Sequence, residues 1–471
     1  MPDPLDARDE EAALEYVLET ARHYLAELSE SPVLPAHGHR FDGALAEDGD
    51  GALAALSELV AGSDVATRSS GPRFFHFVTG GTTPAALAAD WLTSLLDQNS
   101  FSAVSSPFGD QLEDVAIRWL LQLFELPESW GGVLTTGATM ANFVGLAGAR
   151  RWWAARHGVD IDERGFAGLP AVPIFSSEYV HASARKALAM LGIGRESVRV
   201  VDVEALERAL RELDGAPAIV IGNAGDVNTG DFDPLGRMAD LAAEHGAWLH
   251  VDGAFGLFAR LTPTASALAE GVERADSVIA DGHKWLNVPY DCGFAFVRDP
   301  AYLQPPFQLA AAYLPSDERP SPEASRRARA LAVWATLRAY GRTGYRAMVE
   351  RHLELAQRLS RRVDETPELE RLAETKLNIV CFRFRPPGLG EEQLDELNLA
   401  LGQDMLADGR VFVGTTRYQG KAAFRPAIVN WRTTERDVDL LVDVLLELGA
   451  KAAHAGKAGM GSSGRRRRAG A

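Results

Sequence analysis

One lysine in an apolar setting could do covalent chemistry. Lys284 lies in the segment SVIADGHKWLNVPYDCGFAFV, beside His283 and Trp285 and between two apolar runs. Only six of the 48 basic residues are lysine, so arginine is used nearly everywhere that a positive charge is enough. A half-buried lysine can lose its proton and condense with an aldehyde to a Schiff base, which arginine cannot do. The alternative is an ordinary surface lysine in a loop.

Two further polar residues end or follow apolar segments. Asp252 ends AWLHVD and is followed by Gly253 and Ala254, and His181 follows AVPIFSS and opens the helical pattern HASARKALAML. A carboxylate at such a position could keep the nitrogen of a pyridine ring protonated, and an imidazole could stack on the ring. A turn or helix-capping role for Asp252 and a structural role for His181 are the alternatives.

A turn of small residues could bind an anion. In residues 131–150, GGVLTTGATMANFVGLAGAR, a strand-like segment leads through Gly137, Ala138 and Thr139 into a helical pattern. Backbone N–H groups at a helix N-terminus, together with the Thr139 hydroxyl, would suit a phosphate. The sequence has no HExxH, Walker or strand-linked GxGxxG pattern, so it does not indicate a zinc protease, a P-loop protein or a dinucleotide-binding protein.

The elements that must position these residues alternate along the chain. From about residue 80 to 300, helical patterns alternate with short apolar segments, several of them rich in Val and Ile. This alternation predicts an α/β fold with a mainly parallel sheet covered by helices on both faces. Ligands of such sheets bind beyond the carboxyl ends of the strands. The expected strands lie within 131–137, 171–177, 197–203, 216–225, 247–253, 277–282 and 292–299.

Four parts of the chain differ in pattern. The sequence predicts a helical arm over 1–80, a large domain over 81–340, a small α+β domain over 341–455 and a disordered basic tail over 456–471. In the small domain, NIVCFRF, RVFVG and AAFRPAIVNW read as strands, and Thr434 could cap the last helix. The proline-rich segment 300–325 is predicted to be a mobile loop.

Composition and charge narrow the class of protein. With 471 residues, 46% of them hydrophobic, and a net charge of −17, the chain is typical of an acidic globular protein of two or three domains. We expect no general affinity for nucleic acid or anionic membranes. Two cysteines exclude a disulfide framework and a multi-cysteine metal site. MPDPLDARDEE lacks signal-peptide features, and no apolar run is long enough to span a membrane, so we expect a cytoplasmic protein.

Together these segments resemble a known family. The chain is similar to the group II amino-acid decarboxylases, which are fold-type I pyridoxal-phosphate (PLP) enzymes and include aromatic-L-amino-acid decarboxylase. HVDGAFG resembles the family segment that bears the aspartate, and GHKWLNVPYDCG resembles the highly specific segment that bears the Schiff-base lysine. GPRFFHFVTGG, SSPFGDQLED and NTGDFDP match further family segments, so the resemblance extends from about residue 70 to 445.

The resemblance implies a role for each matching residue. Lys284 would hold PLP as a Schiff base, Asp252 would pair with the pyridine nitrogen, and His181 and Ala254 would pack on the two faces of the ring. The phosphate would be lined by Ala138, Thr139 and His283, with Asp281 as a further cofactor-binding position. The substrate pocket would include Phe77, Val78, Thr79 and Phe101, with Phe101 reaching in from the second subunit of a homodimer whose N-terminal arms intertwine.

The chain departs from the family pattern at three places. Asp281 stands where the family often has Asn, and Val227 stands where many members have Thr. The mobile loop of the family carries a tyrosine that protonates the carbanion after CO2 leaves, but LPSDERPSPEAS contains none. Tyr313, just upstream, is the candidate for that role.

The resemblance implies decarboxylation of an L-amino acid to an amine and CO2. The alternatives are oxidative deamination to an aldehyde, another PLP-dependent lyase reaction, and a PLP-binding dimer without activity. Phe77, Val78, Phe101 and Tyr290 favour an aromatic or apolar substrate, because a pocket for an acidic side chain ordinarily presents a cation. Arg73 or Arg425 could supply that cation, so an acidic or short polar substrate stays open; Arg425 could equally support the small domain.

Overall fold

The computed structural model describes residues 9–34, 41, 45, 47–309, 312, 313 and 318–465. Side chains are described as far as residue 452, except that of Asp64. Within these residues, no helix combines the length and the apolar character needed to cross a membrane.

A seven-stranded sheet in the order β1-β7-β6-β5-β4-β2-β3 forms the centre of the chain. β7 is antiparallel to both of its neighbours, and the other pairs run parallel. Each segment predicted between residues 131 and 299 contains one of these strands, which confirms the α/β fold with its mainly parallel sheet. The strands are β1 (Gly131–Thr135), β2 (Ile174–Ser176), β3 (Val198–Val200), β4 (Ile219–Asn223), β5 (Trp248–Asp252), β6 (Ser277–Asp281) and β7 (Gly293–Val297).

Helices bury both faces of this sheet, because successive side chains of a strand point to opposite faces. In β4, Val220 packs in the cluster that holds α8 and α9, whereas Ile219 and Ile221 pack in the cluster that holds α5 and α7. The helices of this part of the chain are α3 (Pro84–Leu96), α4 (Pro107–Leu123), α5 (Ala138–Arg156), α6 (Ile161–Arg164), α7 (Ala182–Met190), α8 (Val203–Glu212) and α9 (Leu235–His245).

A second, antiparallel sheet lies in the C-terminal part, in the order β10-β11-β9-β8. One expected strand, RVFVG at 410–414, is wrong: Phe412 instead forms a single bridge with Phe74 and exchanges backbone hydrogen bonds with Arg73 and Phe75. Residues 73–75 therefore form the backbone hydrogen bonds that 410–414 would otherwise have made with a strand of the small sheet. The elements are β8 (Leu369–Arg371), β9 (Phe382–Phe384), α11 (Glu391–Asp408), β10 (Thr415–Tyr418) and β11 (Lys421–Phe424).

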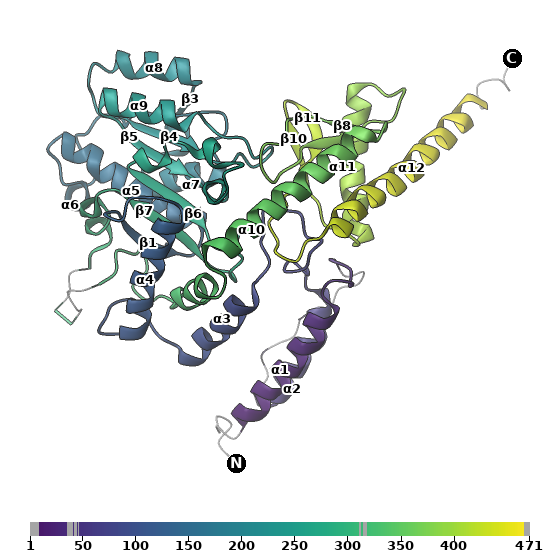
Figure 1. The fold of residues 1–471 in the computed structure, drawn as a ribbon, viewed down its shortest axis with the longest axis horizontal. Coiled ribbons are helices and arrows are strands. Elements are labelled where there is room, and N and C mark those ends of the chain that lie inside the picture. The colour runs from purple at the N-terminus through teal and green to yellow at the C-terminus, as the bar shows by residue number, and fades with distance from the viewer. Residues whose placement is uncertain are drawn as a thin grey trace.

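Two long helices accompany the small sheet. α10 (Ala330–Glu365) runs from the large sheet to the small one (Figure 1) and changes direction at Gly341, whose φ of 56° only glycine adopts readily. α12 (Glu435–Arg465) begins after Thr434, whose hydroxyl and N–H both donate to Asp437. It extends past residue 456, where the sequence predicts a disordered tail to begin; residues 466–471 lie outside the described residues.

The N-terminal helices project from the rest of the chain. α1 (Glu10–Glu27) and α2 (Ala52–Gly62) lie side by side and extend away from the sheet (Figure 1). They expose leucines that would ordinarily be covered, namely Leu14, Leu18, Leu25, Leu53 and Leu59. The sequence predicts a helical arm over 1–80, and α1 and α2 lie within that range; the bounds of the arm stay a prediction.

Candidate active site

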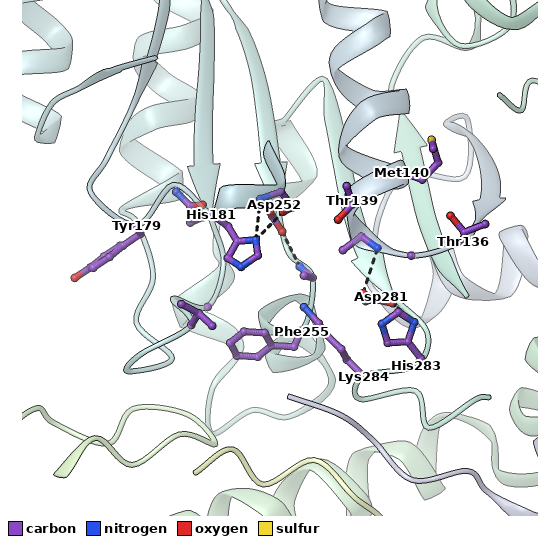
Figure 2. A pocket seen from close by; sticks show the side chains of 17 residues that line it. Thr136, Thr139, Met140, Tyr179, His181, Asp252, Phe255, Asp281, His283 and Lys284 are labelled. Carbon is purple, nitrogen blue, oxygen red and sulfur yellow. Dashed lines mark hydrogen bonds and ion pairs between the residues drawn. The ribbon is translucent and has the colours of Figure 1, made fainter. Parts of the chain in front are cut away.

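Strand ends meet around one cavity of about 300 Å³ at the carboxyl edge of the large sheet. β1, β2, β4, β5 and β6 all run toward this edge, so the residues that follow them converge (Figure 2). Every residue that the sequence predicts to bind the cofactor lines the cavity. The lining residues are Thr136, Gly137, Ala138, Thr139, Met140, Tyr179, His181, Ser183, Asn223, Gly225, Val227, Asp252, Ala254, Phe255, Asp281, His283 and Lys284.

The turn between β1 and α5 brings a helix N-terminus to the cavity. Gly137 has φ 151° and ψ 179°, a backbone conformation confined almost to glycine, and a Cβ there would lie 3.0 Å from Cε1 of His283. α5 then begins at Ala138, so the unpaired N–H groups of its first turn face the lining residues. This end of a helix carries partial positive charge and suits an anion such as phosphate.

Asp281 ends β6 directly opposite this turn. Its Oδ2 accepts a hydrogen bond from the Ala138 N–H at 3.1 Å, and its Oδ1 lies 2.9 Å from Nδ1 of His283. Asp281 Oδ1 and His283 Nδ1 are both buried, and the described residues give neither a well-aligned hydrogen bond. The His283 ring also stacks on Tyr290, with ring centroids 4.2 Å apart. A carboxylate and an imidazole therefore share the place where an anion would bind.

Asp252 ends the central strand β5 and is buried. Its Oδ1 accepts a hydrogen bond from the Ala254 N–H at 3.2 Å, and its Oδ2 accepts one from Nδ2 of Asn142 at 2.8 Å. Both donors fix the carboxylate at the edge of the cavity. Ala254 lines the cavity beside it with no more than a methyl group.

His181 is the N-cap residue of α7, where its side chain accepts a hydrogen bond from the Ser183 N–H at 3.2 Å. The same nitrogen, Nδ1, lies 2.7 Å from the Ser183 hydroxyl. Because Nδ1 accepts, the ring proton is on Nε2. Burial lowers the pKa of His181, and the negative charge of Asp252 opposes that shift. The neutral imidazole is therefore favoured.

Lys284 rises into the cavity from the side opposite Asp252, with Phe255 on one flank and His283 on the other (Figure 2). Its Nζ lies 5.7 Å from the centroid of the Phe255 ring. Within the described part of the chain, this amine has no hydrogen bond and no ion pair. It is therefore available to react.

The segment 71–81 is held directly against the turn that bears Lys284. The Gly80 N–H donates to the His283 carbonyl at 3.1 Å, and the Gly81 N–H donates to Oδ1 of Asn287 at 3.0 Å. A Cβ at Gly80 would lie 1.9 Å from the Lys284 carbonyl oxygen, so only glycine permits this approach.

The predicted substrate residues 77–79 lie in that same segment. Phe77 and Val78 both have φ 57°, a strained conformation for residues with a side chain and more so for β-branched Val. Phe77 is 60% exposed, whereas Val78 and Thr79 are buried. None of the three residues lines the cavity. The Thr79 hydroxyl lies 3.1 Å from the hydroxyl of Tyr290, whose ring stacks on the lining residue His283.

The two candidate arginines differ in their partners. Arg73 forms ion pairs with Asp437 and Glu30. Arg425 is 7% exposed, and its Nη1 has no hydrogen-bond partner among the described residues. Burial lowers the pKa of Arg425, and burial together with the Arg425 charge lowers the pKa of His76 to about 4. Neither arginine lines the cavity, but Arg425 differs from Arg73 in forming no ion pair among the described residues.

Phe101 and Tyr313 lie outside this constellation in the single chain. Phe101 is buried against its own subunit, and its carbonyl accepts the Arg319 N–H. Tyr313 is 86% exposed, and residues 310, 311 and 314–317 around it lie outside the described residues. Neither residue lines the cavity.

Several lining residues escaped the sequence reasoning. Asn223 ends β4 and Phe255 closely follows Asp252, so both lie at strand ends and the same rule could have found them. Tyr179 precedes His181 in a loop and carries no comparable signal. Asn142, in the interior of α5, does not line the cavity but contacts Asp252.

The fold and the arrangement of the site residues are those of the fold-type I PLP enzymes. Across 96% of this chain and 100% of the other, the structure matches that of Oryza sativa TDC with PLP and tryptamine, with a TM-score of 0.87 and 25% sequence identity. The resemblance found in the sequence is thereby confirmed at the level of the whole fold.

Residues 57–385 match the pyridoxal-dependent decarboxylase conserved domain, and the chain belongs to the pyridoxal-dependent decarboxylase family. It is a PLP-dependent carboxy-lyase. The chain is 29% identical over 403 residues to aromatic-L-amino-acid decarboxylase of Bacillus atrophaeus, which covers 81% of each chain. It is also 29% identical over 413 residues to an acidic amino acid decarboxylase of Mus musculus, covering 81% of this chain and 74% of that protein.

The residues present fit PLP. The cavity of about 300 Å³ lies at the lower end of the size range of small-molecule sites, and it contains a helix N-terminus and an amine without a partner among the described residues. Nδ1 of His283, which lies 2.9 Å from Oδ1 of Asp281 without a well-aligned hydrogen bond among the described residues, adds a polar group at the phosphate end. Of the two acidic lining residues, Asp252 and Asp281, it is Asp281 that contacts the N-terminus of α5 and whose charge opposes a phosphate there.

Proposed function

We propose that this cavity decarboxylates an L-amino acid with an aromatic or apolar side chain to the corresponding amine and CO2. When bound, PLP supplies an electron sink for the electron pair that the departing CO2 leaves behind. The observation that supports the site is the convergence of Lys284, Asp252 and His181 with the N-terminus of α5 around one cavity.

Each of these residues has its own proposed role toward PLP. Lys284 is assigned to covalent attachment, because its Nζ is the amine in the cavity without a partner among the described residues. Asp252 is assigned to the pyridine nitrogen, because two N–H donors fix its carboxylate at the end of β5. His181 is assigned to one face of the ring and Ala254 to the other, with Thr139, Ala138 and His283 at the phosphate.

The preference for an aromatic or apolar substrate rests on the arginines. Arg425 can neutralise the α-carboxylate of the substrate, and a second cation would be needed for an acidic side chain. Arg73, the other candidate, is already neutralised by Asp437 and Glu30. The aromatic rings of Phe77 and Tyr290 are exposed, and that of Tyr290 stacks on the lining residue His283.

We also propose that the working unit is a homodimer. The apolar side chains exposed on α1 and α2, together with Trp91, Leu92 and Leu95 on α3, form surface that a second copy would cover. Phe101 would then approach the partner's site. Sedimentation equilibrium should give twice the chain mass, and a monomer with full activity would contradict this part of the proposal.

Replacement of Lys284 tests the function most directly. Lys284→Ala should lose the visible absorbance of the bound cofactor and lower turnover by at least about a thousandfold, because the amine is the attachment point. A panel of the common amino acids, read by amine formation, should show the highest kcat/KM for aromatic or apolar substrates. An active Lys284→Ala variant would overturn the site, and a preference for glutamate or aspartate would overturn the substrate class.

One observation favours a second candidate reaction, oxidative deamination of the substrate to an aldehyde. The described residues of the segment 300–325 place no phenol in the cavity, and Tyr313 points to solvent. Without a proton donor from that segment, O2 and water can convert the decarboxylated carbon to an aldehyde, with release of ammonia and hydrogen peroxide. Measuring CO2, amine, aldehyde and hydrogen peroxide from one substrate separates decarboxylation to the amine from oxidative deamination.

A further inference from the structure

Behind the cavity, a line of buried side chains connects the core of the sheet with Asp252. The Trp248 Nε1–H donates to Oγ of Ser277 at 2.9 Å, and Ser277 Oγ lies 2.8 Å from Nδ1 of His250. His250 Nε2 lies 2.8 Å from Oδ1 of Asn142, whose Nδ2 donates to Oδ2 of Asp252 at 2.8 Å. Strands β5 and β6 and helix α5 all contribute to this line.

The direction of each hydrogen bond follows from the chemistry of the groups. An indole can only donate and a carboxylate can only accept, which fixes both ends of the line. The amide of Asn142 must therefore turn its nitrogen toward Asp252 and its oxygen toward His250. His250 donates from Nε2 and accepts the Ser277 hydroxyl at Nδ1, which is the neutral form. Burial lowers the pKa of His250 to about 4 and so favours the same form.

Asn142 also reaches the second cofactor-facing residue. Its Nδ2 donates to the Ser183 hydroxyl at 3.1 Å, and that hydroxyl lies 2.7 Å from Nδ1 of His181. One amide group thus uses both of its N–H bonds to support residues that face the cavity. Gly145, one turn further along α5, leaves room for the arrangement, since a Cβ there would lie 2.7 Å from Cε1 of His250.

We propose that Asn142 is a positioning residue that orients Asp252 and His181 together, and that His250 sets the orientation of its amide. This inference rests on the roles proposed above for Asp252 and His181. A flipped amide would place its oxygen against the carboxylate and leave a buried acceptor pair without a proton between them, which is costly in a protein interior. His250 prevents the flip, because its Nε2–H requires an acceptor.

The first test replaces the amide while keeping its size. Asn142→Asp removes both N–H donors, and Asn398→Asp is the matched control, because Asn398 is an equally buried asparagine that holds the backbone of Phe384 in the small domain. For each variant, apo-protein is titrated with PLP, the wavelength of the visible band is recorded, and the thermal midpoint of the apo-protein is measured.

We expect Asn142→Asp to weaken PLP binding by at least about tenfold and to shift the visible band. Asn398→Asp should lower the thermal midpoint but change PLP affinity less than about twofold, because its hydrogen bonds are remote from the cavity. Asn142→Asp with wild-type affinity and band would overturn the inference. Equal losses of affinity in both variants would overturn it as well, because they would indicate a general structural effect.

The second test reads the amide orientation and does not depend on Asn142→Asp folding. His250→Gln keeps a donor for Oδ1 of Asn142, and His250→Leu removes it. The glutamine variant should stay within about threefold of wild-type PLP affinity, and the leucine variant should lose at least about tenfold. Equal affinities in the two variants would overturn the inference. Lys284→Ala, measured alongside, separates the two levels: if it keeps the visible band, the proposed site itself fails, whatever the Asn142 and His250 variants do.

Discussion

Oδ2 of Asp281 accepts a hydrogen bond from the backbone N–H of Ala138 at 3.1 Å. This N–H belongs to the first turn of α5, and we propose that the N–H groups of this turn bind the phosphate of PLP. A carboxylate therefore occupies one of the donors that the phosphate would use, and it adds a like charge beside it.

Asp281→Asn should bind PLP about threefold to tenfold more tightly than the wild type, because the change removes a negative charge and adds a donor. Fluorescence titration of the apo-protein measures this affinity. Pyridoxal, which lacks the phosphate, is the control ligand and should bind both proteins alike. Weaker PLP binding by the variant would indicate that the carboxylate serves chiefly to hold His283.

The buried guanidinium of Arg425, which forms no ion pair among the described residues, predicts that substrate binding can be impaired separately from cofactor binding. Arg425→Gln should raise KM for the amino acid by about ten to a hundredfold, because a charge-assisted contact to the α-carboxylate is lost. PLP affinity should change little.

Arg73→Gln is the matched control, since Arg73 is just as buried but is held by Asp437. It should lower thermal stability and leave KM nearly unchanged. The proposed role of Arg425 is wrong if the two variants raise KM equally.

Tyr313 gives a prediction about the product. If its phenol reaches the site during turnover and supplies the proton, Tyr313→Phe should lower the yield of amine per CO2 and raise aldehyde and hydrogen peroxide. Tyr302→Phe is the control, because that ring packs edge-on against Trp248 in the core. An unchanged ratio of products in Tyr313→Phe would exclude Tyr313 as the proton donor.

A buried histidine next to the Lys284 turn makes stability depend on pH. Nδ1 of His352 accepts the Trp285 Nε1–H at 2.8 Å, and its Nε2 donates to the Asn430 carbonyl at 3.0 Å. Burial lowers the pKa of His352 from 6.5 to about 3. Below pH 6.5 the unfolded chain binds a proton that the folded chain does not, so stability is lost as the pH falls toward 3.

This single site should contribute a slope of about 1.4 kcal/mol per pH unit over that window. Chemical denaturation at several pH values measures the free energy of unfolding. His352→Gln should show a slope smaller by about one proton. Parallel slopes for the wild type and His352→Gln would contradict the prediction.

Site residues at the ends of strands could be predicted from the sequence, whereas those elsewhere in the fold could not. Asp252 ends a strand, Ala138 and Lys284 follow strands, and the parallel strands bring all three to one edge, so the local sequence pattern is enough to predict them. Asn142 sits inside a helix, where an asparagine gives no signal, and its importance depends on His250, 108 residues away. Arg73 and Arg425 could not be told apart, because the partner that neutralises Arg73 is Asp437, 364 residues along the chain. Likewise, 410–414 has strand character, but its backbone pairs with residues 73–75.

The contact between Gly80 and the Lys284 carbonyl has a practical consequence for engineering. The side chain of Phe77 is 60% exposed and can be varied to test the proposed substrate pocket, but position 80 admits no larger residue without displacing the turn that carries the Lys284 amine. A library that randomises position 77 and leaves 78–81 untouched should therefore keep a high share of cofactor-competent members.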